Sequence, residues 1–220
     1  MTDPATLHYV YDPLCGWCYG AAPLIEAARQ IDRLQLVLHG GGLMAGPRRR
    51  TIDAAFGDFV KTADARIAAA TNQPFTSAYY DGLLGEIGTV LDSAVPIAGV
   101  LAAEHMGGQG AALLARLQRA HYVAGEKISS RDVVRQTAAG LGLDPTLFDP
   151  AFRRAVETSV DQHIEDTRAM MRKHGLHGFP SFVLERASGE LLPIDVSPYL
   201  GQPSQWGERL QAVMQRGRMQ

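Results

Sequence analysis

The stretch YDPLCGWCYG, residues 11–20, contains the only two cysteines of the chain, Cys15 and Cys18. It follows Leu7–Tyr11, a short run of β-branched and aromatic residues that is typical of a buried strand, and a helical pattern begins directly behind it. Two thiols at C-x-x-C spacing beside a strand-to-helix junction are typical of a redox pair. The helix start favours a thiolate at the first cysteine, and the second is close enough to attack a mixed disulfide formed there.

Two other uses of paired cysteines stay open beside this interpretation. A structural zinc site usually takes four Cys or His ligands, but the seven histidines form no H-x3–5-H pattern next to a second C-x-x-C. His174 and His177 come nearest, three residues apart. A purely structural disulfide is the other alternative. The pattern favours redox chemistry over both, and we expect no metal site.

The composition fits one domain, or one domain with a large insertion, because the chain has 220 residues, 46% hydrophobic and 20% charged. A net charge of −2 gives no electrostatic basis for binding nucleic acid or an anionic membrane. No apolar run is long enough to span a bilayer. The chain reaches its first strand by Leu7, which leaves no room for a signal peptide. If Met1 is the natural start, we expect a cytoplasmic protein, in which adjacent cysteines are more often catalytic than structural.

The residues after the cysteines predict a helix over about 17–32, kinked at Pro23 because proline removes a backbone donor. A second strand follows at Leu34–His39, and then three consecutive glycines at 40–42. These glycines lack the G-x-G-x-x-G spacing of a dinucleotide-binding loop. We interpret them as a close backbone approach beside the cysteines, with phosphate binding as the alternative.

The middle of the chain is predicted to be entirely helical. Helical patterns alternate with breakers there, with no strands between them. A short helix is expected to begin at Asp144-Pro145, and the last helix to break near Thr158. The other helices are expected at about 52–70, 93–105, 109–124, 131–140 and 151–174.

Strand patterns return near the C-terminal end, at 181–185 and 191–196 with a turn between them, followed by a closing helix at about 203–215. The resulting order is β-α-β, a helical block, and β-β-α. This order predicts an α/β, thioredoxin-like fold with a large all-helical insertion. We expect a discontinuous thioredoxin-like domain of residues 1–46 and 175–220, with residues 47–174 as the insertion subdomain, including the helix that returns to the sheet.

The sequence GFPSF at 178–182 stands directly before a predicted strand. A proline there lacks a donor for the sheet, and an X–Pro bond adopts the cis form at little cost. A cis proline leaves a backbone edge open, and a substrate backbone could pair with it beside a reactive sulfur. The alternative is an ordinary proline at the start of a strand.

Three motifs together resemble the DsbA family of thioredoxin-fold thiol–disulfide oxidoreductases, most closely its FrnE-like, non-secreted branch. They are YDPLCGWCYG at 11–20, the glycine-rich Gly40–Leu43, and GFPSF at 178–182. The helical insertion lies between the same strands as in that family, so the resemblance spans nearly the whole chain.

The resemblance implies a role for each of four residues. Cys15 would be the attacking nucleophile, Cys18 the buried resolving cysteine, and Pro180 a cis proline facing them. Phe179 would contact substrate. Within the C-x-x-C, Gly16 and Trp17 would help to bind substrate, although Trp17 could instead pack against the insertion.

The dipeptide between the cysteines departs from the strongly oxidising secreted members of the family, which have Pro-His where this chain has Gly16-Trp17. Together with the missing signal peptide, this favours reduction or isomerisation over oxidation. Substrates would be proteins or small molecules that contain disulfides or thiols. No organic cofactor is required, and glutathione is a candidate reductant.

Two other functions remain as alternatives. Glutathione transferases of the kappa class and hydroxychromene-carboxylate isomerases share this scaffold, but their chemistry does not need a resolving cysteine. The third alternative is a binding module that uses the insertion as a partner surface without catalysis.

Overall fold

A four-stranded mixed sheet lies at the centre of the protein, whose computed structural model describes residues 4–215. The two inner strands pair antiparallel with each other, and each also pairs with one outer strand, parallel in one case and antiparallel in the other. In spatial order the strands are β2 (Leu34–Gly40), β1 (Ala5–Tyr11), β5 (Ser181–Arg186) and β6 (Leu191–Ile194). The predicted order of β-α-β before the helical block and β-β-α after it is therefore confirmed.

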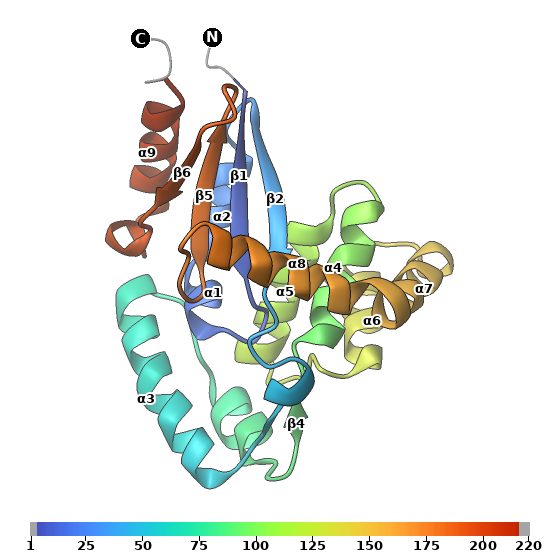
Figure 1. Cartoon of the computed structure of the whole chain (residues 1–220). Helices are drawn as coiled ribbons and strands as arrows, with labels where there is room; N and C mark the ends of the chain where they lie inside the picture. Colours follow the sequence, from blue (N-terminus) through green and yellow to red (C-terminus); the bar gives the residue numbers. More distant parts are fainter. Residues whose placement is uncertain (1–3, 216–220) are drawn as a thin grey trace.

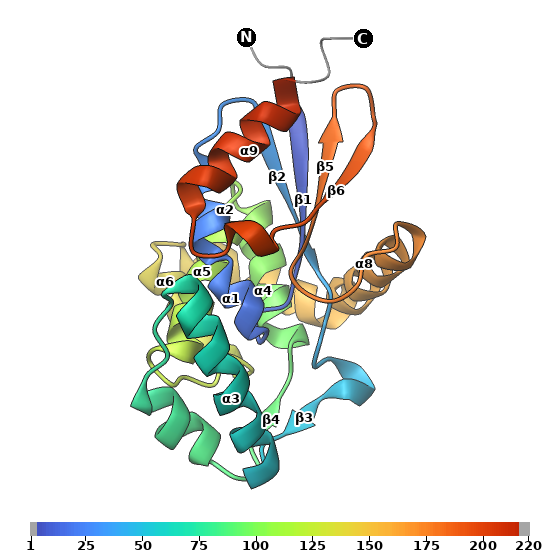
Figure 2. The ribbon, with the colours of Figure 1, turned by 90° about the vertical axis from the view of Figure 1, so that its left-hand side faces the viewer.

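Helices cover both faces of this sheet. Figure 2 shows α2 (Ala22–Arg29) and α9 (Pro203–Gln215) on one face and α8 (Val160–Lys173) on the other. Aromatic side chains fill the first of these interfaces, where Phe182 stacks on Tyr9 and meets Trp206 of α9 edge-on. All three are buried, so the closing helix is held to the sheet by apolar burial.

The prediction of one kinked helix over 17–32 is wrong, because the segment forms two helices. The first is α1 (Gly16–Gly20), and a single residue, Ala21, separates it from α2. Pro23 lies in the first turn of α2, where a missing backbone donor costs nothing, and not inside a continuous helix. The chain also leaves the helical conformation at Arg29, earlier than expected.

The insertion below and beside the sheet in Figure 1 is mainly helical, as predicted. It also contains a two-residue ladder of β3 (Arg50–Thr51) with β4 (Val90–Leu91), so the expectation of a block without strands is wrong. A π-helical turn followed by a 3₁₀ turn, over residues 78–85, was not predicted. The α-helices before α8 are α3 (Ala54–Thr71), α4 (Ala94–His105), α5 (Gly110–Tyr122), α6 (Arg131–Gly140) and α7 (Pro145–Arg154).

The prediction of a separate helix from residue 151 is wrong as well. Helix α7 begins at Pro145 and runs past Pro150, which lies inside it. It continues through a π-helical turn at Ala155–Ser159 into α8, so the irregularity expected near Thr158 is present. Whether the chain divides at residues 46/47 and 174/175 stays a prediction.

The second strand of the C-terminal hairpin ends at Ile194, two residues before its predicted end.

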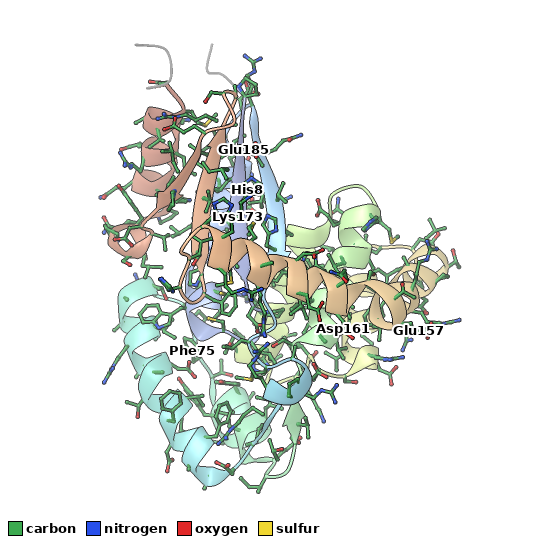
Figure 3. The ribbon with its side chains drawn as sticks, in the orientation of Figure 1. His8, Phe75, Glu157, Asp161, Lys173 and Glu185 are labelled. Atoms are coloured by element: carbon green, nitrogen blue, oxygen red, sulfur yellow. The ribbon has the colours of Figure 1, made fainter. Side chains whose placement is uncertain are left out.

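At the far end of the sheet from the chain termini, Phe75 of the insertion lies close to α1 (Figure 3), and its ring meets Tyr19 edge-on. Within residues 4–215 no helix is long and apolar enough to cross a membrane.

Candidate active site

Three segments that are distant in sequence meet at the lower end of the sheet in Figure 1. Because β1 and β2 are parallel, the cysteine loop after Tyr11 and the glycines after Leu38 leave the same edge. Strand β5 runs antiparallel to β1, so the segment ending at Pro180 enters at that edge too. The topology therefore brings together the cysteines, the glycine run and the proline.

Cys15 caps the N-terminal end of α1 and lies at the edge of the core, with 8% of its surface exposed. Its thiol donates to the carbonyl oxygen of Phe179 over 3.5 Å. The peptide bond between Phe179 and Pro180 is cis. The sulfur thus faces the backbone edge just before the cis proline, which is the arrangement that the resemblance implies.

Cys18 lies one turn further along α1 and is fully buried. Its sulfur accepts the backbone N–H of Asp12 over 3.4 Å. Burial raises the pKa of the Cys18 thiol well above its ordinary value, and the neighbouring Cys15 raises it further. Both cysteines are free, and of the two only Cys15 keeps any exposed area.

The glycine run packs directly against the residue before the proline. A Cβ atom added to Gly41 would lie 2.1 Å from Cε1 of the Phe179 ring, so any side chain there would displace it. Arg168 of α8 holds this loop from the other side, donating to the carbonyl of Gly41 over 2.8 Å and to that of Gly42. The predicted close approach of the glycine backbone is confirmed.

Asp12 is a central residue of the site, although nothing in the sequence singled it out. Its buried carboxylate accepts hydrogen bonds from the Leu14 amide (2.9 Å), the Leu43 amide (2.5 Å) and the Ser93 hydroxyl (2.9 Å). Burial raises the pKa of Asp12 to about 6, although these hydrogen bonds favour the charged form. The contact to Leu14, two residues on, is an Asx turn, which Asp-Pro-Leu could have indicated.

The two residues between the cysteines have different surroundings. The Trp17 side chain is 37% exposed, on the surface beside Cys15. Gly16 is covered by α3, and an added Cβ would lie 2.7 Å from Ile67 and 2.9 Å from Asp64. Their expected contribution to substrate binding stays a prediction.

Two histidines, His8 and His39, lie within neighbouring strands of the sheet. His8 bridges His39 (2.9 Å) and Glu185 (3.0 Å) across β2, β1 and β5, in the upper part of the sheet (Figure 3). Across the described range, 4–215, no three Cys, His, Asp or Glu side chains are grouped to hold a metal ion.

Comparison with known proteins identifies this arrangement. A family model described as the DSBA-like thioredoxin domain matches residues 6–196. The chain belongs to the DSBA-like thioredoxin family. Its thioredoxin-like fold with a helical insertion and its class as a thiol–disulfide oxidoreductase follow from that membership, and its substrates are thiols and disulfides.

Solved structures agree with this assignment. The cytosolic disulfide reductase DsbM from Pseudomonas aeruginosa is 46% identical, with 95% of this chain and 98% of that chain covered and a TM-score of 0.89. The same reductase with GSH superposes with a TM-score of 0.87. DsbA from the same organism, at 14% identity and a TM-score of 0.55, shares the fold, with 99% of this chain and 86% of that one covered. A search of curated proteins found no match.

Proposed function

We propose that this DSBA-like protein reduces disulfides by cycling Cys15 and Cys18 between dithiol and disulfide. The Cys15 thiolate attacks one sulfur of the substrate, forming a mixed disulfide and releasing the other sulfur as a thiolate that takes up a proton. Cys18 then loses its proton and attacks Cys15. The Cys15–Cys18 disulfide forms, and the second substrate sulfur leaves and is protonated.

The difference in position between the two sulfurs is the observation that carries this proposal. Cys15 keeps 8% of its surface exposed, with its thiol aimed at the Phe179 carbonyl, whereas Cys18 is fully buried with a raised pKa. A thiolate is the reacting form, so an external disulfide meets Cys15 first. Cys18 can then attack the Cys15 sulfur of the mixed disulfide and release the substrate sulfur, which is what a resolving cysteine does.

The cis Phe179–Pro180 segment is proposed to bind the substrate backbone next to the mixed disulfide. The Phe179 carbonyl lies within reach of the Cys15 sulfur and is unpaired once that thiol has reacted. Exposed Trp17 would add apolar contact, and the partly exposed backbone of Gly16 would lie beside the bound substrate chain.

Reduction is proposed as the net direction, with glutathione returning the disulfide to the dithiol in the cytoplasm. The support is the 46% identity to a cytosolic disulfide reductase that has also been solved with GSH. Isomerisation uses the same first step and differs only in that the substrate resolves its own mixed disulfide.

A trapping experiment tests the cycle. The Cys18→Ser variant is incubated with a disulfide-bonded protein such as insulin, and adducts are measured by mass spectrometry. We expect a stable mixed disulfide at Cys15 and loss of glutathione-coupled insulin reduction. Cys15→Ser, the matched control, should form no adduct.

The same variants separate the glutathione-dependent isomerase or transferase alternative. An enzyme of that kind would keep turning over without Cys18, because glutathione supplies its only sulfur. Full turnover of Cys18→Ser without an adduct would contradict the proposed dithiol cycle.

A further inference from the structure

The insertion places one buried carboxyl group against the C-x-x-C motif. Asp64 lies on α3, whose C-terminal half runs beside α1 in Figures 1 and 2, and only 4% of its surface is exposed. Its Oδ1 atom is 2.9 Å from where a Cβ of Gly16 would be. Gly16 follows Cys15 directly, so only a residue without a side chain admits the carboxyl at this position.

The surroundings of Asp64 leave its charge uncompensated. The Tyr79 hydroxyl hydrogen-bonds to the carboxyl, but Oδ2 is buried with no hydrogen-bond partner. Among residues 4–215 no cation forms an ion pair with it. Desolvation raises the pKa of Asp64 to about 7, so its charge changes near neutral pH.

The titratable groups that face Asp64 come from two elements. Tyr79 and Tyr80 belong to the π-helical turn at 78–82, and the hydroxyl of Tyr122 on α5 interacts with Asp64 and with both cysteines. These tyrosines have raised pKa values and stay neutral in the range in which Asp64 titrates. The cysteines are therefore the groups on this side whose charge changes with the reaction.

We propose that Asp64 is a positioning residue whose negative charge destabilises the Cys15 thiolate and makes the Cys15–Cys18 pair a stronger reductant. This rests on the proposed dithiol cycle. The reacting form of the reduced pair is the Cys15 thiolate, whereas the disulfide carries no charge. A carboxylate in the same desolvated region repels only the reduced form, and so favours the transfer of its two electrons to a substrate disulfide.

The effect is reciprocal and depends on pH. Oxidation removes the thiolate, so Asp64 loses its proton more readily in the disulfide form. When Asp64 is protonated, at about pH 5, it exerts no charge on Cys15. The predicted influence on the redox equilibrium therefore grows as pH rises through 7, a dependence that a purely structural role would not produce.

The test is a glutathione redox titration of Asp64→Asn at pH 5 and pH 8, in the full chain. At pH 8 we expect the variant to be less reducing than the wild type by about tenfold in its equilibrium constant, which corresponds to about 30 mV. At pH 5 the equilibrium constants of the variant and the wild type should agree within about twofold. The alkylation rate of Cys15 should reach its half-maximum at lower pH in the variant.

Two further variants keep the test decisive. Asp58→Asn changes an exposed carboxylate on the same helix and should match the wild type at both pH values. Asp64→Ala removes the charge without adding an amide and should repeat the shift if Asp64→Asn folds poorly. Equal potentials for wild type and both Asp64 variants at pH 8 would overturn the inference. Failure of the wild type itself to form a reversible disulfide would instead overturn the proposed function.

Discussion

The sheet and the helical insertion contribute to the active site in different ways. Segments that leave the sheet carry the reacting sulfurs and the cis proline, at Cys15, Cys18 and Pro180. The insertion carries none of these groups, but its side chains contact the cysteine loop and the glycine run beside it. Ser93 and Arg168 are the clearest cases, bonded to Asp12 and to the glycine run respectively. The sheet supplies the chemistry, and the insertion controls the geometry and charge around it.

This comparison predicts two classes of mutational effect. Changes to the groups from the sheet segments should abolish a chemical step, because no other sulfur can replace them. Changes to the supporting contacts should alter stability or potential by a few kcal/mol or less, because each removes one contact among several.

The largest effect is expected for Cys15→Ser. Serine leaves the packing almost unchanged but has no thiolate, so disulfide reduction should fall to the background rate. The rate of reduction of a protein disulfide with glutathione as reductant measures this loss, and thermal unfolding is the control for folding. Residual turnover well above background would mean that Cys18 can attack substrate directly, despite its burial.

A large pH-dependent effect on stability is expected at Asp12. Its pKa is raised to about 6 in the folded protein, so ionisation costs more there than in the unfolded chain. The stabilisation is complete below about pH 4 and is lost as pH rises to about 6, by about 3 kcal/mol in all. Asp12→Asn does not titrate, so the wild-type advantage in unfolding free energy should shrink across this window.

Urea unfolding of both proteins between pH 4 and pH 7 measures this difference. The wild-type advantage should level off above about pH 6. An advantage that is independent of pH would show that the Asp12 carboxyl titrates alike in the folded and unfolded chains.

A smaller loss of stability is expected for Arg168→Ala. The guanidinium donates to the carbonyls of Gly41 and Gly42, and charged hydrogen bonds of this kind contribute about 2 kcal/mol. Arg172→Ala, at an exposed position on the same helix, is the matched control and should change unfolding by less than about 0.5 kcal/mol. Equal losses for the two variants would show that Arg168 does not hold the glycine loop.

The smallest expected loss of stability is at Gly41. Alanine there would push the Phe179 ring aside, which should cost about 1 kcal/mol because the overlapping atoms are at the end of a side chain. The KM for a protein disulfide should rise, since Phe179 is proposed to contact substrate. An unchanged KM with a displaced ring would remove Phe179 from the proposed substrate surface.

Features that depend on local sequence were predictable. The C-x-x-C, the strand patterns and the proline before β5 each have a signature within a few residues, and the order of strands gave the sheet that joins them. The three consecutive glycines also predicted a close backbone approach, but they did not indicate that the neighbouring side chain would be Phe179.

Features that depend on distant partners were not predictable. The hydrogen bond between Asp12 and Ser93 joins residues 81 positions apart, and the one between Arg168 and Gly41 joins residues 127 positions apart. Nothing in the sequence around Ser93 or Arg168 distinguishes either of them from an ordinary surface residue. The carboxyl of Asp64 had no signature either, because its surroundings come from α1 and from the π-helical turn at 78–82. The continuous passage of α7 through Pro150 was missed because tertiary packing outweighs the local helix-breaking tendency of proline.

The central claim is that Cys15 and Cys18 form a reversible, reducing disulfide pair. Equilibration of the protein with a series of glutathione redox buffers, read as the fraction of free thiol, tests it most directly. We expect a single reversible transition at a potential of about −200 mV or lower, as for a pair kept reduced by cytosolic glutathione. A potential near about −120 mV, typical of a strong oxidant, or no reversible transition at all, would contradict it.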